Sequence, residues 1–222
     1  MTMLHRARFS SWARGHLLCR VEDVGGRFAL TFDDGPSLNT TPRLLDVLAH
    51  HGARATFFLL GLNVRRAPEL VRRVAAEGHE LALHGDLHWP LALSPPWMIR
   101  SEIQKCARAV HDATGVQARF FRPPFGFMMP GQSAFVRHLG YESVLGDIYP
   151  EDPRRPGTAR IVSRVMQRLR AGSILILHDG SPTGERDRSQ TVDALEVILQ
   201  KASHQGLAAV TVAHLLDAAP AP

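Results

Sequence analysis

The regular alternation of apolar runs with amphipathic segments is the feature that most constrains the fold of this chain. The run Ser173–Leu177 is almost wholly apolar, as expected of a strand buried on both faces, and Ala55–Leu60 resembles it. The segment Thr41–His50 instead repeats leucine and valine at helical spacing. Strand and helix alternate in this way about seven times, which predicts parallel strands joined by helical crossovers.

The expected elements cover most of the chain. We predict strands at Phe28–Phe32, Ala55–Leu60, Glu80–Leu83, Ala118–Arg122, Glu142–Leu145, Ser173–Leu177 and Ala208–Val212, and helices at Thr41–His50, Pro68–Glu77, Ser94–Thr114, Gly131–Leu139, Thr158–Arg170 and Gln190–Ser203. Ser94, just before Pro95, is the expected N-cap of its helix. At 222 residues, the pattern favours a closed or nearly closed (β/α) barrel, with a doubly wound open sheet as the main rival.

Composition excludes several other classes of protein. The chain is 45% hydrophobic and 21% charged, which is ordinary for one globular domain and does not suggest disorder, collagen or a membrane span. Its formal charge of +5 comes from arginines scattered over many segments, so we expect no nucleic-acid partner. No oligomeric state is predicted.

The first 26 residues lack the continuous apolar stretch of a signal peptide. As written, the sequence therefore predicts a cytoplasmic protein. A misplaced start codon or a trimmed N-terminus would change that expectation to a secreted or envelope protein.

Reactive residues follow the predicted strands, where a barrel places its chemistry. Asp33 and Asp34 end the first strand, and two adjacent buried carboxylates repel each other unless a cation lies beside them. In HGDLH, His84 and His88 are four residues apart and lie on one side of a turn. Two imidazoles and one carboxylate form a three-ligand site with open positions, as in catalytic zinc sites, although other divalent metals also fit.

Three further clusters complete this pattern. Arg122 precedes two rigid prolines and is expected to pair with a buried carboxylate, Asp33 being the natural candidate. In the same loop, before Gly126, the Phe125 amide is a candidate oxyanion donor. His178 ends an apolar strand and is the candidate general acid. The segment GDIYPEDP offers three carboxylates that could orient this histidine, namely Asp147, Glu151 and Asp152.

With these clusters in view, the chain resembles the polysaccharide deacetylases of carbohydrate esterase family 4, which carry the chitooligosaccharide deacetylase homology domain. TFDDGP, HGDLH and RPPFG match three motifs of that family, and the ILH of ILILHDG matches its LxH, with Ile176 in place of leucine. The resemblance runs from about Phe28 to Leu216, so we expect an N-terminal extension at 1–25 and the deacetylase domain at 26–218.

The resemblance implies a distorted (β/α)7–8 barrel, TIM-like, and a role for each motif residue. Asp33 would be the catalytic base, tuned by Arg122, and His178 the general acid. One divalent metal, Zn²⁺ first and Co²⁺, Mn²⁺ or Ni²⁺ as alternatives, would be held by Asp34, His84 and His88.

The implied reaction is hydrolysis of an N-acetyl amide on an amino-sugar glycan, such as a chitin oligomer or peptidoglycan, with release of acetate. Phe125, Gly126 and Ile176 would face the substrate. The family's fourth motif aligns its aspartate with Asp152 but puts Pro153 where a tryptophan is usual. The alternatives are a hydrolase of a non-polymeric amide, including formylated sugars, and a catalytically silent carbohydrate-binding homologue.

Overall fold

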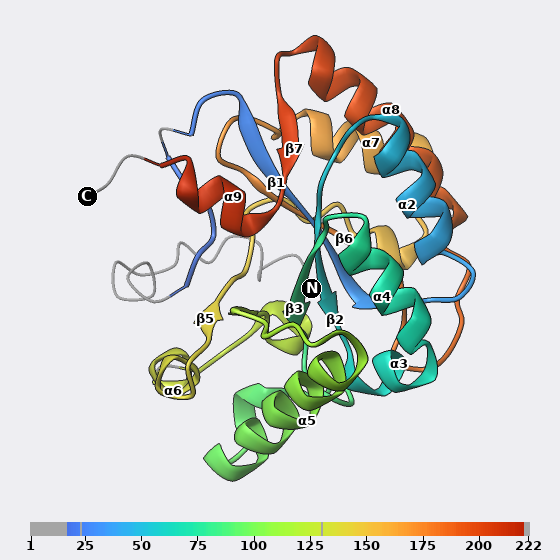
Figure 1. Ribbon diagram of the computed structural model, residues 1–222. Coiled ribbons are helices and arrows are strands. Elements are labelled where there is room, and N and C mark those ends of the chain that lie inside the picture. The colour runs from blue at the N-terminus through green and yellow to red at the C-terminus, as the bar shows by residue number, and fades with distance from the viewer. Residues whose placement is uncertain (1–16, 23, 130, 220–222) are drawn as a thin grey trace.

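A curled parallel sheet forms the centre of the molecule (Figure 1). The computed structural model describes residues 17–22, 24–129 and 131–219. The strands of the sheet are β1 (Arg27–Gly35), β2 (Thr56–Leu59), β3 (Glu80–Leu83), β4 (Phe120–Phe121), β5 (Glu142–Ser143), β6 (Ile174–His178) and β7 (Ala208–Val210).

The strand order settles the choice between a barrel and an open sheet. The strands lie in the order β5-β4-β3-β2-β1-β6, and β7 also pairs with β1. Strands β2 to β5 therefore follow one another on one side of β1, and β6 pairs with its other side. Beyond β5, Ile148 forms a parallel bridge to Leu175 of β6, which draws the two edges together. The sheet is a distorted barrel, as predicted, and the open-sheet alternative is wrong.

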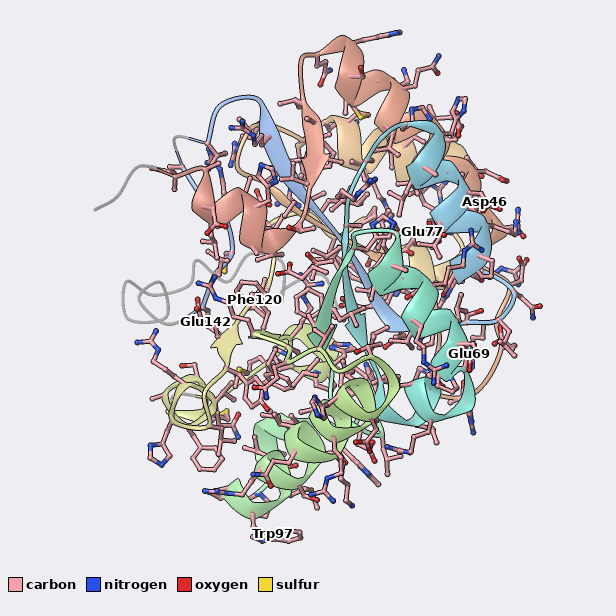
Figure 2. The ribbon with its side chains drawn as sticks, in the orientation of Figure 1. Asp46, Glu69, Glu77, Trp97, Phe120 and Glu142 are labelled. Atoms are coloured by element: carbon pink, nitrogen blue, oxygen red, sulfur yellow. The ribbon has the colours of Figure 1, made fainter. Side chains whose placement is uncertain are left out.

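Most of the helices cover the outside of this sheet, whereas the last one contributes Val212 and Leu215 to the core on its inner face. The helices are α2 (Thr41–His50), α3 (Gly61–Arg66), α4 (Pro68–Ala76), α5 (Pro96–Thr114), α6 (Gln132–His138), α7 (Thr158–Met166), α8 (Ser189–His204) and α9 (Val212–Asp217), with short 3-10 turns η2 (Leu91–Leu93), η3 (Pro124–Gly126) and η4 (Asp152–Arg154). Asp46 on α2 and Glu69 on α4 point into solvent from the outer helix faces (Figure 2). Among the described helices, none combines the length and apolar character needed to cross a membrane.

Neighbouring phenylalanines show how the sheet supports two separate cores. Phe57 points outward and stacks on Phe32 in the large core beneath the helices, with ring centroids 5.0 Å apart. Phe58, the next residue, belongs to the smaller core inside the barrel. Side chains alternate between the two faces of a strand, so apolar residues are needed at both positions.

Each expected strand and helix is present, most of them with shifts at their ends. The bounds predicted for α2 and β3 match, but Ser94 is not the N-cap of α5: Pro95 occupies that position, and the Ser94 hydroxyl donates to the Pro90 carbonyl. Two helices of six residues, α3 and α9, were not predicted. Such short helices show less than two turns of periodicity, so the pattern carries little signal. The strand predicted to extend to Val212 ends at Val210, where the chain turns into α9.

The start of the described chain joins the barrel. Leu18 bridges to Val144 and Arg20 to Ser173, so part of the predicted N-terminal extension lies against the strands. Residues 1–16 and 23 of that extension lie outside the described residues.

Candidate active site

Strand register brings the predicted residues to one end of the barrel. Asp33 of β1 pairs in register with His178 of β6. His84 follows β3 directly, and its backbone amide donates to the last residue of β2. Arg122 follows β4, and its amide donates to the Leu83 carbonyl, which ends β3. The carboxyl ends of neighbouring parallel strands thus collect all four motifs.

A bulge explains how two adjacent aspartates serve one site. In the pairing of β1 with β2, Asp33 lies opposite Phe58 and Gly35 opposite Leu59, so Asp34 is an extra residue with φ of 73°. Successive residues of a regular strand point to opposite faces, and a bulge re-aims the side chain. Both carboxylates therefore approach His84, whose Nε2 lies 3.9 Å from an Asp33 oxygen and 3.6 Å from an Asp34 oxygen.

Asp33 is paired with a fully buried arginine. The Arg122 Nη1 donates to the Asp33 Oδ1 at 2.5 Å and to the Thr31 hydroxyl at 2.8 Å. The remaining donors reach the carbonyls of Val144 and Leu145, and the guanidinium lies 3.9 Å from the centre of the Phe58 ring. The Arg122 side chain is only 1% exposed, so its charge requires these partners inside the barrel.

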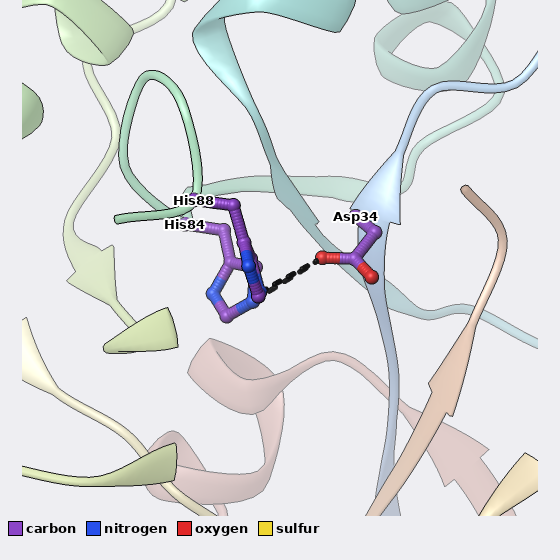
Figure 3. A group of neighbouring side chains, drawn as sticks. All are labelled: Asp34, His84 and His88. Atoms are coloured by element: carbon purple, nitrogen blue, oxygen red, sulfur yellow. Dashed lines mark ion pairs between the residues drawn. The ribbon is translucent and has the colours of Figure 1, made fainter. Parts of the chain in front are cut away.

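Asp34, His84 and His88 form a compact group suited to a metal ion (Figure 3). Their ligand atoms lie within 4.8 Å of one another, and Asp34 Oδ1 is 3.3 Å from His88 Nε2. This buried oxygen has no hydrogen-bond partner among the described residues. An orphaned carboxylate oxygen facing two imidazole nitrogens is the donor set expected of a catalytic zinc or similar divalent ion, so the residues fit the predicted metal.

The protonation of His84 agrees with that fit. Its Nδ1 lies 2.8 Å from the Arg122 carbonyl, which can only accept, so Nδ1 carries the proton and Nε2 presents a lone pair to the site. Burial, followed by the nearby His88, lowers the pKa of His84 to about 3. The imidazole is therefore neutral at ordinary pH, as a metal ligand must be.

His178 is held by Asp152, one of the three carboxylates offered by the sequence. Asp152 accepts from the His178 backbone amide at 2.9 Å, and its Oδ1 lies 3.0 Å from His178 Nδ1. Burial lowers the pKa of His178, but the charge and hydrogen bond of Asp152, with Asp34 and Asp33, outweigh it and raise the pKa to about 9. Asp147 and Glu151 do not share this position: Asp147 accepts from the start of β6, and Glu151 pairs with Arg154 and Arg164.

The residues predicted to face the substrate surround this group. The Phe125 backbone is left-handed, with φ of 63°, and its ring lies 4.5 Å from that of His88 and is 69% exposed. The Gly126 amide is used within the turn, donating to Pro123 at 3.0 Å. Ile176 precedes His178 by two residues on β6, so the two side chains lie on the same face of the strand.

Comparison with known proteins agrees with this geometry. The family model of polysaccharide deacetylases matches residues 21–144. The chain belongs to the polysaccharide deacetylase family. It is 40% identical to a chitooligosaccharide deacetylase from Bradyrhizobium sp. (strain ANU 289), over 83% of this chain and 89% of that protein. It is 38% identical to a peptidoglycan-N-acetylglucosamine deacetylase from Bacillus cereus, over 91% of this chain and 93% of that protein.

Solved structures show the same fold. The crystal structure of a peptidoglycan N-acetylglucosamine deacetylase superposes with a TM-score of 0.88 at 29% identity, over 93% of this chain and 95% of that one. The resemblance stated from the four motifs is therefore confirmed, and it extends over most of the chain.

Several supporting residues of this family member were missed by the sequence analysis. Asn63 donates to the Asp34 carbonyl at 2.8 Å and so braces the bulge; it lies on the unpredicted helix α3. Thr31, a polar residue within an apolar strand, links Arg122 to the Leu175 carbonyl. Asp86, the central residue of HGDLH, pairs with Arg65 at 2.7 Å.

A further buried carboxylate lies behind the aspartate pair. Asp179 accepts from the Thr41 hydroxyl at 2.5 Å, and burial raises its pKa to about 7. A Cβ atom on Gly35 would approach an Asp179 oxygen to 2.2 Å, and one on Gly180 would approach the Asp34 carbonyl oxygen to 2.1 Å. Glycine at both positions lets β6 pack closely on the bulge. In the sequence, the motif HDG, formed by His178, Asp179 and Gly180, could have indicated these contacts.

The first prediction concerns Arg122. Replacing it with methionine should lower the free energy of unfolding by about 3–5 kcal/mol, because Asp33 is left buried without its partner. Arg119→Met is the matched control: that arginine pairs with Glu142 but is half exposed, so its loss should cost no more than about 1 kcal/mol. Denaturant unfolding of both variants measures the difference, and equal costs would contradict the buried pair.

The second prediction concerns the pH dependence of stability. The pKa of His178 is about 9 in the folded protein against an ordinary value of 6.5, so its protonated form stabilises the fold. In metal-free protein, the difference in unfolding free energy between wild type and His178→Gln should be full below pH about 6.5 and disappear as pH rises through about 9. Denaturation series across this range test it, and a difference that does not change with pH would refute it.

Proposed function

We propose that this protein is a metal-dependent deacetylase that hydrolyses the N-acetyl group of N-acetylglucosamine units in a glycan such as a chitin oligomer or peptidoglycan. The observation that carries the proposal is the meeting of three groups at one barrel end: Asp33 with its arginine, the Asp34–His84–His88 group, and His178 with its aspartate. The activities named for the two relatives, both N-acetylglucosamine or chitooligosaccharide deacetylases, support the same reaction.

The resident ion is proposed to be Zn²⁺, with Co²⁺, Mn²⁺ or Ni²⁺ as alternatives. A neutral His84, a second imidazole and one carboxylate are ligands that zinc accepts in catalytic sites. When bound, such an ion supplies Lewis acidity, which makes water a stronger acid and an amide carbonyl a better electrophile.

Asp33 is proposed as the general base. Arg122 compensates the negative charge of its carboxylate, and only one of its oxygens takes this bond. The other oxygen lies 3.9 Å from His84 Nε2, so it borders the ligand group. There it can accept a proton from a water molecule as the oxygen of that water bonds to the acetyl carbon.

His178 is proposed as the general acid. An amine is a poor leaving group until it is protonated, so breaking the C–N bond requires a proton donor beside the nitrogen. The Asp152 carboxylate keeps the imidazole charged near neutral pH and directs the opposite ring nitrogen, Nε2, away from itself. His178 gives its proton to the sugar nitrogen as the bond breaks, which releases acetate and a free amine.

The loop of η3 is proposed to bind the developing oxyanion. The backbone amide of Phe125 is the candidate donor, in a loop held rigid by Pro123 and Pro124. Ile176, on the same strand face as His178, would line the pocket for the acetyl methyl group.

The third prediction tests the reaction. Zinc-loaded protein should release acetate from N-acetylglucosamine oligomers, and Asp33→Asn should lower the rate by about 10²–10⁴-fold because the base is lost. Asp46→Asn, which changes an exposed aspartate on α2, should leave the rate unchanged. Release of formate from N-formyl sugars but no acetate would indicate the alternative substrate. No release of either would indicate the silent homologue and contradict the proposal.

The fourth prediction tests the metal. His84→Ala should abolish both stoichiometric zinc binding at the barrel end and acetate release, because the three-ligand group is broken. His51→Ala is the matched control, since His51 lies with His50 and Glu196 in a separate, largely exposed group. Metal content after dialysis and the rate after reloading measure both. Full activity in His84→Ala would overturn the assignment.

A further inference from the structure

Most of the large apolar side chains that the described structure exposes come from two loops next to the ligand group. One loop follows β3 and leads into α5, and the other follows β4 and leads into α6. The exposed large apolar residues here, together called the apolar loop surface, are Leu87, Trp89 and Leu93 of the first loop, Trp97 in the first turn of α5, and Phe125, Phe127 and Met129 of the second loop.

Contacts between the two loops make this one surface. Gln132, at the start of α6, donates to the carbonyls of Leu91 and Ala92 at 2.9 and 3.2 Å. The Arg100 guanidinium, in the first turns of α5, lies 5.7 Å from the centre of the Phe135 ring of α6. At the other end, the Phe125 ring packs on His88. The apolar loop surface therefore extends from the ligand group to the beginning of α5.

The degree of exposure is unusual for such side chains. Leu93 is 92% exposed and Trp97 is 67% exposed. Figure 2 shows Trp97 at the end of the molecule, directed away from the barrel. Contiguous exposed apolar groups on a soluble domain mark a place where something else binds.

The charged residues near the apolar loop surface indicate what kind of partner it binds. Residues 87–101 and 123–141 contain no aspartate or glutamate, and their charged side chains are Arg100 and Arg137. Positions 97, 100, 104 and 108 share one side of α5, and all four residues are exposed, so Arg100 and Arg108 follow Trp97 along the helix. Glu102, the acidic residue between these two arginines in the sequence, is buried, and the next acidic residue, Asp112, lies one turn beyond Arg108. Neither Lys105 nor Arg108 has an acidic partner in an ion pair within the described part of the chain.

We propose that the apolar loop surface binds the interface of an anionic lipid bilayer. Tryptophan favours the headgroup region, aliphatic side chains such as Leu93 favour the acyl boundary, and arginines pair with anionic headgroups. A glycan would stack on the aromatic rings but gain little from Leu93 or Met129, so lipid explains more of the surface. This inference goes beyond the proposed reaction: it places the candidate active site beside a membrane, where the sugar of a membrane-anchored molecule is within reach.

Vesicle binding tests the proposal independently of catalysis. The purified protein should co-sediment with vesicles of phosphatidylcholine and phosphatidylglycerol more strongly than with phosphatidylcholine alone, and the tryptophan fluorescence should shift to the blue. The double variant Leu93→Ser with Trp97→Ser should bind these vesicles at least about ten-fold more weakly, because two inserted side chains are lost. Leu38→Ser, a matched change at an exposed leucine in the loop before α2, should bind like wild type.

Charge variants provide a second arm. Arg100→Gln with Arg108→Gln should reduce the preference for phosphatidylglycerol, and circular dichroism verifies that every variant is folded. Failure of the wild type to bind anionic vesicles would overturn the proposal, as would binding that the Leu93 and Trp97 changes leave intact. Concentration-dependent self-association that those changes abolish, without vesicle binding, would overturn it in favour of a second copy of the chain.

Discussion

The buried ion pair between Arg122 and Asp33 is the interaction on which the rest of the active-site structure depends. A guanidinium inside a barrel is costly, because it loses its hydration and tolerates no unpaired donor. Here it bonds to β1 through Asp33 and Thr31 and to the chain after β5 through Val144 and Leu145, while its own backbone extends β4. The cost of burial is thus offset only when these strand ends lie in one arrangement, so the pair helps to specify the geometry of the site.

Arg122 also connects the two halves of the chemistry. Its side chain holds the candidate base, and its backbone carbonyl accepts from His84 Nδ1. The same residue therefore fixes the tautomer of a candidate metal ligand and the charge balance of Asp33. The opposite side of the site follows the same principle with the signs reversed, since buried Asp152 holds His178 in its protonated form. A carboxylate balanced by arginine and an imidazolium balanced by aspartate give the site a base and an acid at one pH.

The outer rim of the site differs from its interior in the kind of side chain that it presents. Inside the barrel, Asp33, Arg122 and His178 are each held by a charged partner, whereas the loops after β3 and β4 expose large apolar side chains to solvent. These exposed side chains belong to neither of the two hydrophobic cores. The exposed loops therefore indicate what binds next to the site, and the residues inside the barrel indicate which reaction the site can perform.

Much of this protein could be read from its sequence, for reasons that differ between residues. The alternation of strand and helix determined a parallel α/β fold, because parallel strands bury apolar runs and need helical crossovers. Only the strand order and the bridge from Ile148 to Leu175 decided that the sheet curls into a barrel. The residues after each strand determined the site, because strand ends meet at one rim: Asp33, Asp34, His84, His88, Arg122 and His178 all lie there.

Short helices such as α3, which carries the supporting residue Asn63, have too few turns of periodicity to be detected in the sequence. The residues themselves left Asp147, Glu151 and Asp152 as candidates for holding His178, and only the family resemblance aligned Asp152 with the aspartate of the fourth motif. The tertiary structure decided for Asp152, through the place that η4 gives it. It also decided that Asp34 joins Asp33 on one side of β1, because that requires a bulge, and a bulge is set by the pairing of neighbouring strands rather than by the residues of one.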